Sequence, residues 1–206
     1  MLIDITRTIG LDTLTYPGDD PPLLEQTDSM ERGGAWNGTH LHLSAHCGTH
    51  LDAPLHFIPH GQCIADLPLS RFRLNAHVID CGDSRVIGAE LLDSAEIRPG
   101  EGVLFKTTNA LLPRTSYSDG FVALNVEAAL RLVDLKAGLA GIDYLSIEAP
   151  GDPQYTVHKT LLGAGMLILE DVDLRNAGPG SYGLYCFPLK LHATEASPVR
   201  AVLETL

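Results

Sequence analysis

The sequence has little positive charge and no long apolar run, and both shortages exclude whole classes of protein. Its 206 residues include 14 Lys and Arg against 26 Asp and Glu, which gives a formal net charge of −12. Nucleic acids and anionic membrane surfaces are themselves negative, so we expect neither as a partner. The apolar runs are far shorter than the roughly 20 residues of a membrane-spanning helix. The opening segment MLIDITRTIG lacks the apolar stretch of a signal peptide, and we expect a cytoplasmic protein.

Cysteine is also scarce, and several common motifs are missing. The four cysteines, Cys47, Cys63, Cys81 and Cys186, form no Cys-x-x-Cys pair. A chain of this length can build a core without disulfides, so we expect four free thiols in a reducing compartment. The sequence contains no Gly-x-Ser-x-Gly, P-loop or Gly-x-Gly-x-x-Gly motif. These absences argue against a serine hydrolase with a nucleophile elbow and against the common nucleotide-binding folds.

Histidine, in contrast, is concentrated in one stretch. Five of the nine histidines lie between Thr39 and Phe57, in THLHLSAHCGTHLDAPLHF. The odd positions are mostly apolar, whereas the even positions carry four candidate site residues: His46, His50, Asp52 and His56. Alternation with period two is typical of extended chain with one buried face, and Gly48 and Pro54 oppose a helix. We therefore expect extended chain with these four side chains directed to one side.

This arrangement favours a metal or catalytic site over a purely structural polar face, because imidazole and carboxylate are ligands for Zn, Mn and Fe. Extended chain rises about 3.3 Å per residue, which would leave the Cα atoms of His46 and His50 roughly 13 Å apart. For both to bind one ion, the chain must bend between them, and Gly48 permits a bend. Cys47 falls on the apolar side by parity, which argues against a Cys/His nucleophile.

Further candidates lie later in the chain, and each has a plain structural alternative. Glu170 ends the apolar run MLIL, where strand ends often build sites, but it also begins the acidic stretch EDVD. His158 stands at a predicted loop–helix junction, as a site residue or as a surface histidine. Asp143 and Glu148, in GIDYLSIE, are weaker candidates.

The other histidines are expected to have lesser roles. His40 and His42 are close enough in sequence to orient metal ligands through their second ring nitrogen. The remaining three are expected to be structural or surface residues: His60, His77 and His192.

The order of apolar segments predicts one α/β domain over residues 1–206, with a mixed sheet. Helices are expected at 88–97, 126–136 and 157–165, the second with Asn125 as its N-cap. The segments 15–24 and 31–38 are expected to be loops, because they are rich in Pro, Gly and Asp or in Gly and Asn. Strands are expected at 1–9, 76–81, 101–107, 120–125, 139–147, 165–174, 182–191 and 198–206.

One alternative metal chemistry has a residue pattern of its own. A His-x-Asp pair followed by a distant histidine is the facial triad of non-haem Fe(II) oxygenases, and His50, Asp52 and His158 could supply it. That hypothesis leaves His46, His56 and Glu170 without a role, and the predicted helices disagree with the β-rich fold usual for those enzymes.

The stretch HCGTHLDAPLHF resembles the H-x-G-T-H-x-D-x-P-x-H signature of the metal-dependent cyclase family, which includes bacterial kynurenine formamidases and isatin hydrolases. The segments YPGD, GIDYLSIE, VHKTLLGAGMLILE and PLKL also resemble that family, so the likeness covers nearly the whole chain. The resemblance implies a swivelling β/β/α-type domain, a homo-oligomer (dimer or tetramer), and a hydrolase that uses one or two Zn²⁺ ions, with Mn²⁺ possible.

The resemblance also implies roles for individual residues. His46, His50 and Asp52 would bind metal with Asp52 bridging two ions, and His56 would be the acid/base. His158 and, twelve positions later, Glu170 would complete the ligand set.

The expected substrate is a small molecule with an amide bond, either an aryl formamide such as N-formylkynurenine or a cyclic amide. Lactone hydrolysis or cyclisation is the alternative within the same family. The formamidases carry a Trp before Pro-Gly-Asp that packs on the kynurenine ring, whereas this chain has Tyr16. Tyr16 is still aromatic, and we expect it to stack on a flat substrate.

Overall fold

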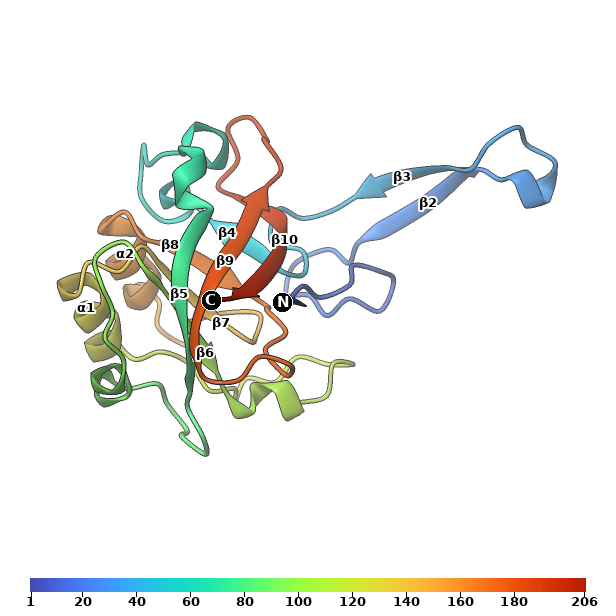
Figure 1. Cartoon of the computed structure of the whole chain (residues 1–206). Coiled ribbons are helices and arrows are strands. Elements are labelled where there is room, and N and C mark those ends of the chain that lie inside the picture. Colours follow the sequence, from blue (N-terminus) through green and yellow to red (C-terminus); the bar gives the residue numbers. More distant parts are fainter.

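The computed structural model describes residues 1–206, apart from the side chain of Ser94. Two α-helices, α1 (Val126–Asp134) and α2 (Thr156–Gly163), pack against a large sheet (Figure 1). The strands in this description are β1 (Leu2–Asp4), β2 (Leu23–Asp28), β3 (Gly38–His42), β4 (His50–Asp52), β5 (Arg73–Asp80), β6 (Gly102–Lys106), β7 (Leu139–Ile142), β8 (Leu167–Glu170), β9 (Gly180–Pro188) and β10 (Ala196–Thr205).

Seven of these strands close into a barrel in the order β10-β4-β8-β7-β6-β5-β9, because β9 also pairs with β10. The pairs β5–β6, β6–β7 and β7–β8 are parallel, and the other pairs of the ring are antiparallel. Strand β1 adds to β10 outside the ring. The predicted α/β class with a mixed sheet is confirmed, whereas closure of the sheet was not predicted. The finer expectation of a swivelling β/β/α domain stays a prediction.

Period-two alternation decides which side chains fill the barrel and which face the helices. On β8, Leu167 and Leu169 belong to a cluster to which all seven barrel strands contribute, so they point inward. Ile168 belongs to a second cluster, which includes residues of both helices, so it points outward. Glu170 is two residues beyond Ile168 and lies on the same outer face. The candidate site therefore lies outside the barrel, under α2.

The helices begin where the sequence predicts them. The side chain of Asn125 accepts a hydrogen bond from the Ala128 N–H (2.8 Å), which confirms the predicted N-cap of α1. Helix α2 starts at Thr156, one residue before the predicted position, and buries His158 along with its apolar residues. The helix predicted at 88–97 is instead a 3₁₀-helix, Ala89–Ser94.

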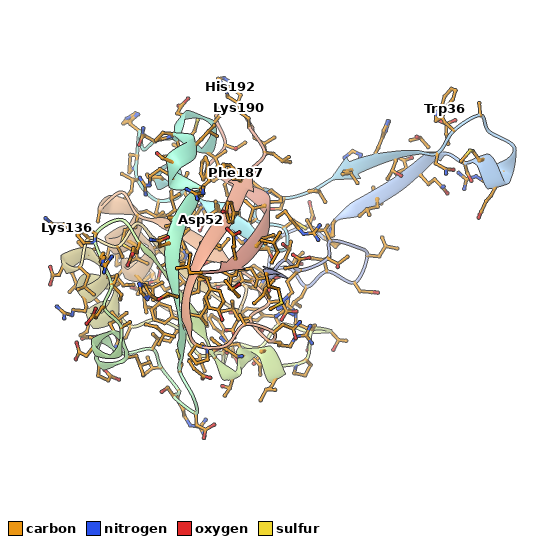
Figure 2. All side chains as sticks on the ribbon, viewed as in Figure 1. Trp36, Asp52, Lys136, Phe187, Lys190 and His192 are labelled. Carbon is orange, nitrogen blue, oxygen red and sulfur yellow. The ribbon has the colours of Figure 1, made fainter. Side chains whose placement is uncertain are left out.

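Strands β2 and β3 form a two-stranded hairpin that projects far from the barrel, as the blue ribbon in Figure 1 shows. We call it the arm. Only loops were predicted around this region, at 15–24 and 31–38, so the arm itself was not predicted. Its exposed apolar residues include the single Trp of the chain, labelled in Figure 2: Leu23, Met30, Trp36 and Leu41.

Two further predictions about extended chain were wrong. The histidine stretch is not one strand: β3 ends at His42, a turn follows, and β4 is succeeded by a 3₁₀-helix over Pro54–His56. The segment 120–125 contributes only isolated bridges at Leu124, although its apolar residues are buried as predicted for a strand. The segment is buried but not regularly paired, and this explains the error, since a buried loop and a buried strand both favour apolar residues.

Candidate metal centre

Pairing between β4 and β8 brings the first two carboxylates and a histidine together. In this antiparallel pair His50 lies opposite Glu170, and Asp52 follows two residues later on the same face. Leu51, between them, points into the barrel core. The His50 Nε2 is 3.4 Å from a Glu170 oxygen and 3.5 Å from Asp52 Oδ1. The strand register therefore fixes three of the predicted site residues.

A bend at Gly48 adds His46, as the sequence predicted. Gly48 has φ +64°, and a Cβ at this position would lie 3.0 Å from the Ile9 side chain, so a larger residue would be both strained and crowded. The His46 and His50 rings come within 5.0 Å of each other, centroid to centroid. The His46 Nδ1 is 3.0 Å from Asp52 Oδ1.

Helix α2 brings His158 over Glu170, and Glu148 holds it there. The His158 Nδ1–H donates to Glu148 Oε2 at 2.6 Å, which leaves Nε2 facing Glu170 Oε1 at 3.3 Å. The same Glu148 carboxylate accepts the backbone N–H groups of Val157 and His158, at the start of α2. The Ile147 N–H donates to Glu170 Oε1 at 2.7 Å. Glu148, a weaker candidate from the sequence, thus fixes both the helix and the ring orientation of His158.

The donor atoms form two groups that share one carboxylate. Two sets of three residues in the described part of the chain have ligand atoms that all lie within 4.8 Å of one another. They are His46, His50 and Asp52, and Asp52, His158 and Glu170. The oxygenase triad of His50, Asp52 and His158 is not among them. The structure therefore brings together all five predicted metal ligands.

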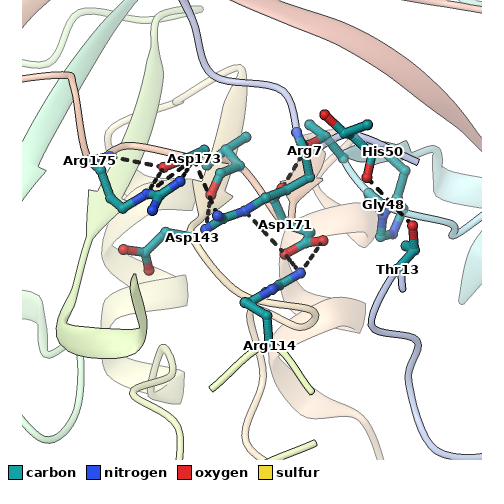
Figure 3. A network of polar contacts seen from close by, with 12 residues as sticks. Arg7, Thr13, Gly48, His50, Arg114, Asp143, Asp171, Asp173 and Arg175 are labelled. Atoms are coloured by element: carbon teal, nitrogen blue, oxygen red, sulfur yellow. Dashed lines mark hydrogen bonds and ion pairs between the residues drawn. The ribbon is translucent and has the colours of Figure 1, made fainter. Parts of the chain in front are cut away.

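The polar atoms of this cluster fit a cation. His50 Nδ1 lies 2.8 Å from the Gly48 carbonyl, to which it must donate, so in the neutral ring that a metal ion requires, Nε2 presents a lone pair (Figure 3). Among the described residues, this Nε2 and both oxygens of Asp52 are buried without a hydrogen-bond partner. Buried acceptors that face each other are costly unless a cation lies between them. The donor set therefore suits a metal ion of the type that imidazole and carboxylate bind.

The electrostatics of the cluster point the same way. Burial lowers the pKa of His158, but Glu148 and Glu170 outweigh burial and raise that pKa to about 10. Burial likewise opposes charge on His50, yet Glu170 and Asp52 raise its pKa to about 9. Burial raises the pKa of Asp52, but the surrounding histidines lower it well below its usual range. The carboxylates thus stabilise positive charge at this position.

His56 lies beside the two donor groups and belongs to neither of them. Its Nε2 is 4.0 Å from Asp52 Oδ2, and its ring lies 4.3 Å from that of His46. The side chain is 25% exposed, on the 3₁₀-helix that follows β4. Burial lowers the pKa of His56, which keeps the ring neutral near pH 7 and able to accept a proton.

A cavity of about 550 Å³ opens above these residues. Its wall includes three aromatic rings, Tyr16, Phe57 and Tyr155, of which only Tyr16 was predicted to contact substrate. Phe57 packs 5.0 Å from Tyr155 and 4.8 Å from His158, centroid to centroid. Phe57 directly follows His56 in the sequence and Tyr155 precedes His158 by three residues, and this proximity is the signal that could have identified them.

A buried ionic network supports the loops that carry the ligands (Figure 3). Asp171 directly follows Glu170, and its carboxylate is 2.8 Å from the Arg114 guanidinium and 3.9 Å from that of Arg7. The hydroxyl of Thr49 donates to the Asp171 carbonyl at 2.6 Å and accepts from the Arg7 N–H at 2.8 Å. Residue 49, next to His50, is thus tied to the residue next to Glu170.

Other candidates lie apart from this site. Asp143 accepts hydrogen bonds from the Thr107 N–H and hydroxyl, and burial raises its pKa to about 6. Cys47 is buried, and burial raises its pKa to about 11, so it stays a neutral thiol. The proposed orienting role of His40 and His42 was wrong for this chain, because both are exposed on the arm.

The remaining expectations about thiols and surface histidines are consistent with the structure. All four cysteines are free. His60 and His192 are exposed, and His77 pairs with Glu101 at 2.8 Å. Neither α-helix in the described part of the chain has the length and apolar character that crossing a bilayer requires.

Fold and site together define a mixed α/β barrel protein with a His/Asp/Glu cluster suited to metal binding on its outer face. The chain belongs to the family described as "Putative cyclase", whose profile matches residues 3–149. A kynurenine formamidase of Salinibacter ruber is 35% identical over 204 residues, which span 98% of this chain and 96% of the relative.

Solved structures agree with this assignment. A potential metal-dependent hydrolase with cyclase activity superimposes with a TM-score of 0.85 at 29% identity, covering 98% of this chain and 96% of the other. Isatin hydrolase A from Labrenzia aggregata, bound to benzyl benzoate, has a TM-score of 0.87, with 98% and 93% coverage. At 24% identity, the second likeness shows a shared fold.

Proposed function

We propose that this protein is a metal-dependent amidohydrolase that cleaves an aryl formamide, such as N-formylkynurenine, or a cyclic amide. The observation that carries the proposal is the pair of donor groups sharing Asp52, with His56 beside them, at the floor of an aromatic-walled cavity. The name of the Salinibacter ruber relative supports the same class, because a formamidase cleaves the carbon–nitrogen bond of a formamide.

The proposed cofactor is Zn²⁺, as one or two ions, with Mn²⁺ as the alternative. His46, His50 and Asp52 would hold one ion, and Asp52, His158 and Glu170 the other. When bound, such an ion supplies a Lewis acid for the substrate carbonyl and lowers the pKa of water towards neutrality. Asp52 is the residue able to serve both ions, because it belongs to both groups and its two oxygens lack hydrogen-bond partners among the described residues.

His56 is the proposed acid/base. Its ring is neutral near pH 7 because burial lowers its pKa, so it can accept a proton from the attacking water. As the protonated imidazolium, it can then donate that proton to the nitrogen of the leaving amine. Its partial exposure and its position in the cavity wall support this role, because a substrate in the cavity could reach it.

The rings of Tyr16, Phe57 and Tyr155 would orient a flat substrate over this floor. Aromatic pairs contribute about 0.5–1.5 kcal/mol beyond the burial of area, which is enough to favour an aryl amide over an aliphatic one. The edge-to-face contact of Tyr16 with Tyr117, at 5.3 Å, holds the Tyr16 ring at the cavity wall.

A substrate screen with metal-loaded and chelated protein tests the proposal. The screen includes N-formylkynurenine, formanilide, a cyclic amide of the isatin type and an aryl lactone. We expect hydrolysis of formamides first and of the cyclic amide second, with loss of both on chelation. Turnover of the lactone alone would favour the alternative activity within the family. Oxygen consumption with Fe(II) would instead support the oxygenase hypothesis.

We also propose that the protein is a homo-oligomer held together by the arm. An isolated two-stranded hairpin is at best marginally stable in water, and this one exposes apolar residues including Trp36. A second copy of the chain is the proposed partner that covers them, since most soluble oligomers are symmetric and built from identical chains.

A further inference from the structure

A second cavity, separate from the one above the candidate metal centre, contains a hydrogen-bonded chain of three side chains. It has a volume of about 560 Å³ and lies along strands β5 and β9, where His77 is opposite Ser181. Among the described residues, this cavity shares no lining residue with the cavity above the metal centre. Ser181, His77 and Glu101 all line it, so any chemistry that they perform is independent of the metal site.

The three side chains run in order from a hydroxyl to a carboxylate. Ser181 Oγ lies 3.2 Å from His77 Nδ1, and Nε2 of the same ring lies 2.8 Å from Glu101 Oε2. Because an ionised carboxylate only accepts, the neutral ring donates to it through Nε2, which leaves the lone pair of Nδ1 for the hydroxyl proton. Nucleophile, base and orienting carboxylate therefore follow each other as in a Ser–His–acid triad, with the roles of the two ring nitrogens exchanged.

Glu101 is held in place to orient this ring. Its Oε2 also accepts the Arg98 N–H at 2.9 Å, and its Oε1 lies 3.5 Å from Asn75 Nδ2. Burial raises the pKa of Glu101, but the hydrogen bonds from the Arg98 N–H and from His77 outweigh burial and lower that pKa, so the carboxylate stays ionised. The side chains of His77 and Glu101 are 15% and 13% exposed, whereas Ser181 is exposed. The base is thus shielded while the nucleophile is open to a substrate.

The other lining residues indicate the class of substrate. Four of them are apolar and suit an acyl or aryl group: Ile79, Ala95, Pro179 and Leu206. The charged ones besides Glu101 are Asp80, Glu96 and Arg98. Lys106, opposite Asp80 in the β5–β6 pair, donates to a backbone carbonyl at 2.8 Å and does not line the cavity. Three carboxylates against one guanidinium disfavour an anionic substrate, and Arg98 supplies positive charge for an oxyanion.

We propose that Ser181, His77 and Glu101 form a second, metal-independent catalytic site that hydrolyses neutral aryl esters through an acyl-serine. Ser181 Oγ bonds to the ester carbonyl carbon while its proton passes to His77 Nδ1. The bond from that carbon to the phenol oxygen then breaks, and the phenoxide takes the proton. Water repeats both steps on the acyl-serine, which releases the carboxylic acid and restores the hydroxyl. Glu101 is a positioning residue, because it acts through the imidazole.

Esters fit this site better than amides. Ser181 lies on strand β9 and not on the sharp turn of a nucleophile elbow, where two backbone N–H groups stabilise the oxyanion. An aryl ester tolerates this, because phenoxide is a good leaving group, whereas an amine must be protonated before it can leave. The activity therefore differs from the proposed amidohydrolase in substrate as well as in place.

The ester p-nitrophenyl acetate and a fluorophosphonate probe test the inference on full-length protein, as purified and after chelation. We expect a burst of p-nitrophenol followed by slower turnover, and mass spectrometry should find the acetyl group on Ser181. The fluorophosphonate, which loses fluoride to an activated serine hydroxyl, should modify the same residue and block the burst. Chelation should leave the burst and both modifications unchanged.

Substitutions assign the roles. Ser181→Ala should lose the burst and both modifications, and His77→Gln should slow the burst by about 10²–10⁴-fold, because the general base is removed. Glu101→Ala should slow it as well, and Glu101→Asp should restore part of the rate, because it keeps the carboxylate. The matched control is Ser70→Ala, which removes another exposed hydroxyl that does not line this cavity. It should behave as the wild type, and thermal melts of all variants show whether the fold is intact.

Each contrary outcome would overturn this inference without affecting the amidohydrolase. Modification of another residue in place of Ser181 would do so, as would a burst that survives in Ser181→Ala or disappears on chelation. The proposed function has its own readout, because formanilide hydrolysis by metal-loaded Ser181→Ala should equal that of the wild type. Loss of formanilide hydrolysis in that folded variant would show that the two sites are not independent, and would also overturn the inference.

Discussion

The substitution Glu148→Gln tests whether the residue behind His158 controls the metal site. Glu148 accepts three hydrogen bonds: from the Val157 N–H (3.0 Å), the His158 N–H (3.1 Å) and the His158 Nδ1–H (2.6 Å). Gln has the same shape but only one acceptor oxygen, so its amide group must face one of these donors. If it faces the imidazole, the ring proton must move to Nε2, which removes the lone pair that faces Glu170.

The expected magnitude follows from these contacts. Loss of the partner that orients a metal-binding histidine typically weakens metal affinity by about 10- to 100-fold, equivalent to about 1.4–2.7 kcal/mol. If the amide instead faces the Val157 N–H, this buried donor at the start of α2 loses its acceptor, at a cost of about 1 kcal/mol in unfolding free energy. We therefore expect weaker metal binding in the first orientation and a modest loss of stability in the second.

Chelator competition with Zn²⁺ and thermal unfolding of the metal-free protein separate these effects. The matched control is Glu127→Gln, which alters an exposed acidic residue in the first turn of α1. It should slightly change stability and leave metal affinity unchanged. A folded Glu148→Gln protein that binds Zn²⁺ as tightly as the wild type and also melts at the wild-type temperature would refute the positioning role.

Three further substitutions have defined expectations. His56→Ala should keep its metal and lose about 10²–10⁴-fold in kcat, because His56 lies outside both donor groups; a metal-free variant would make it a ligand instead. Tyr16→Ala should raise KM for an aryl formamide by about 2- to 12-fold with kcat nearly constant, as steady-state kinetics would show, and an unchanged KM would remove the stacking role. Trp36→Ser should shift the protein towards monomer in light scattering coupled to size-exclusion chromatography, and an unaltered oligomer would exclude this residue of the arm from the interface.

The site could be predicted largely from the sequence because its ligands follow local rules. Alternation over MLILE places Glu170 on the face opposite Leu169, and the same rule relates His50 to Asp52. Gly48 was predicted to bend the chain, and its positive φ confirms that prediction. The family signature assigned the ligand set that the structure brings together.

The remaining features depend on contacts between distant segments. Glu148 serves the site only because α2 docks with its first turn against that carboxylate, and no short-range pattern encodes this docking. Closure of the barrel depends on β9 pairing with both β5 and β10. The arm has strands without a buried face, so β2 lacks the apolar alternation by which a strand is predicted.

Metal content and formanilide hydrolysis, measured on the same protein samples, test the central claim most directly. The samples are the wild type as purified, after chelation and after Zn²⁺ or Mn²⁺ is restored, together with Asp52→Ala. Because Asp52 belongs to both donor groups, its loss should abolish metal binding and turnover together. The account predicts that chelation abolishes wild-type activity and that added metal restores it, but not in the variant. Full turnover by metal-free wild type, or full metal content in Asp52→Ala, would contradict it.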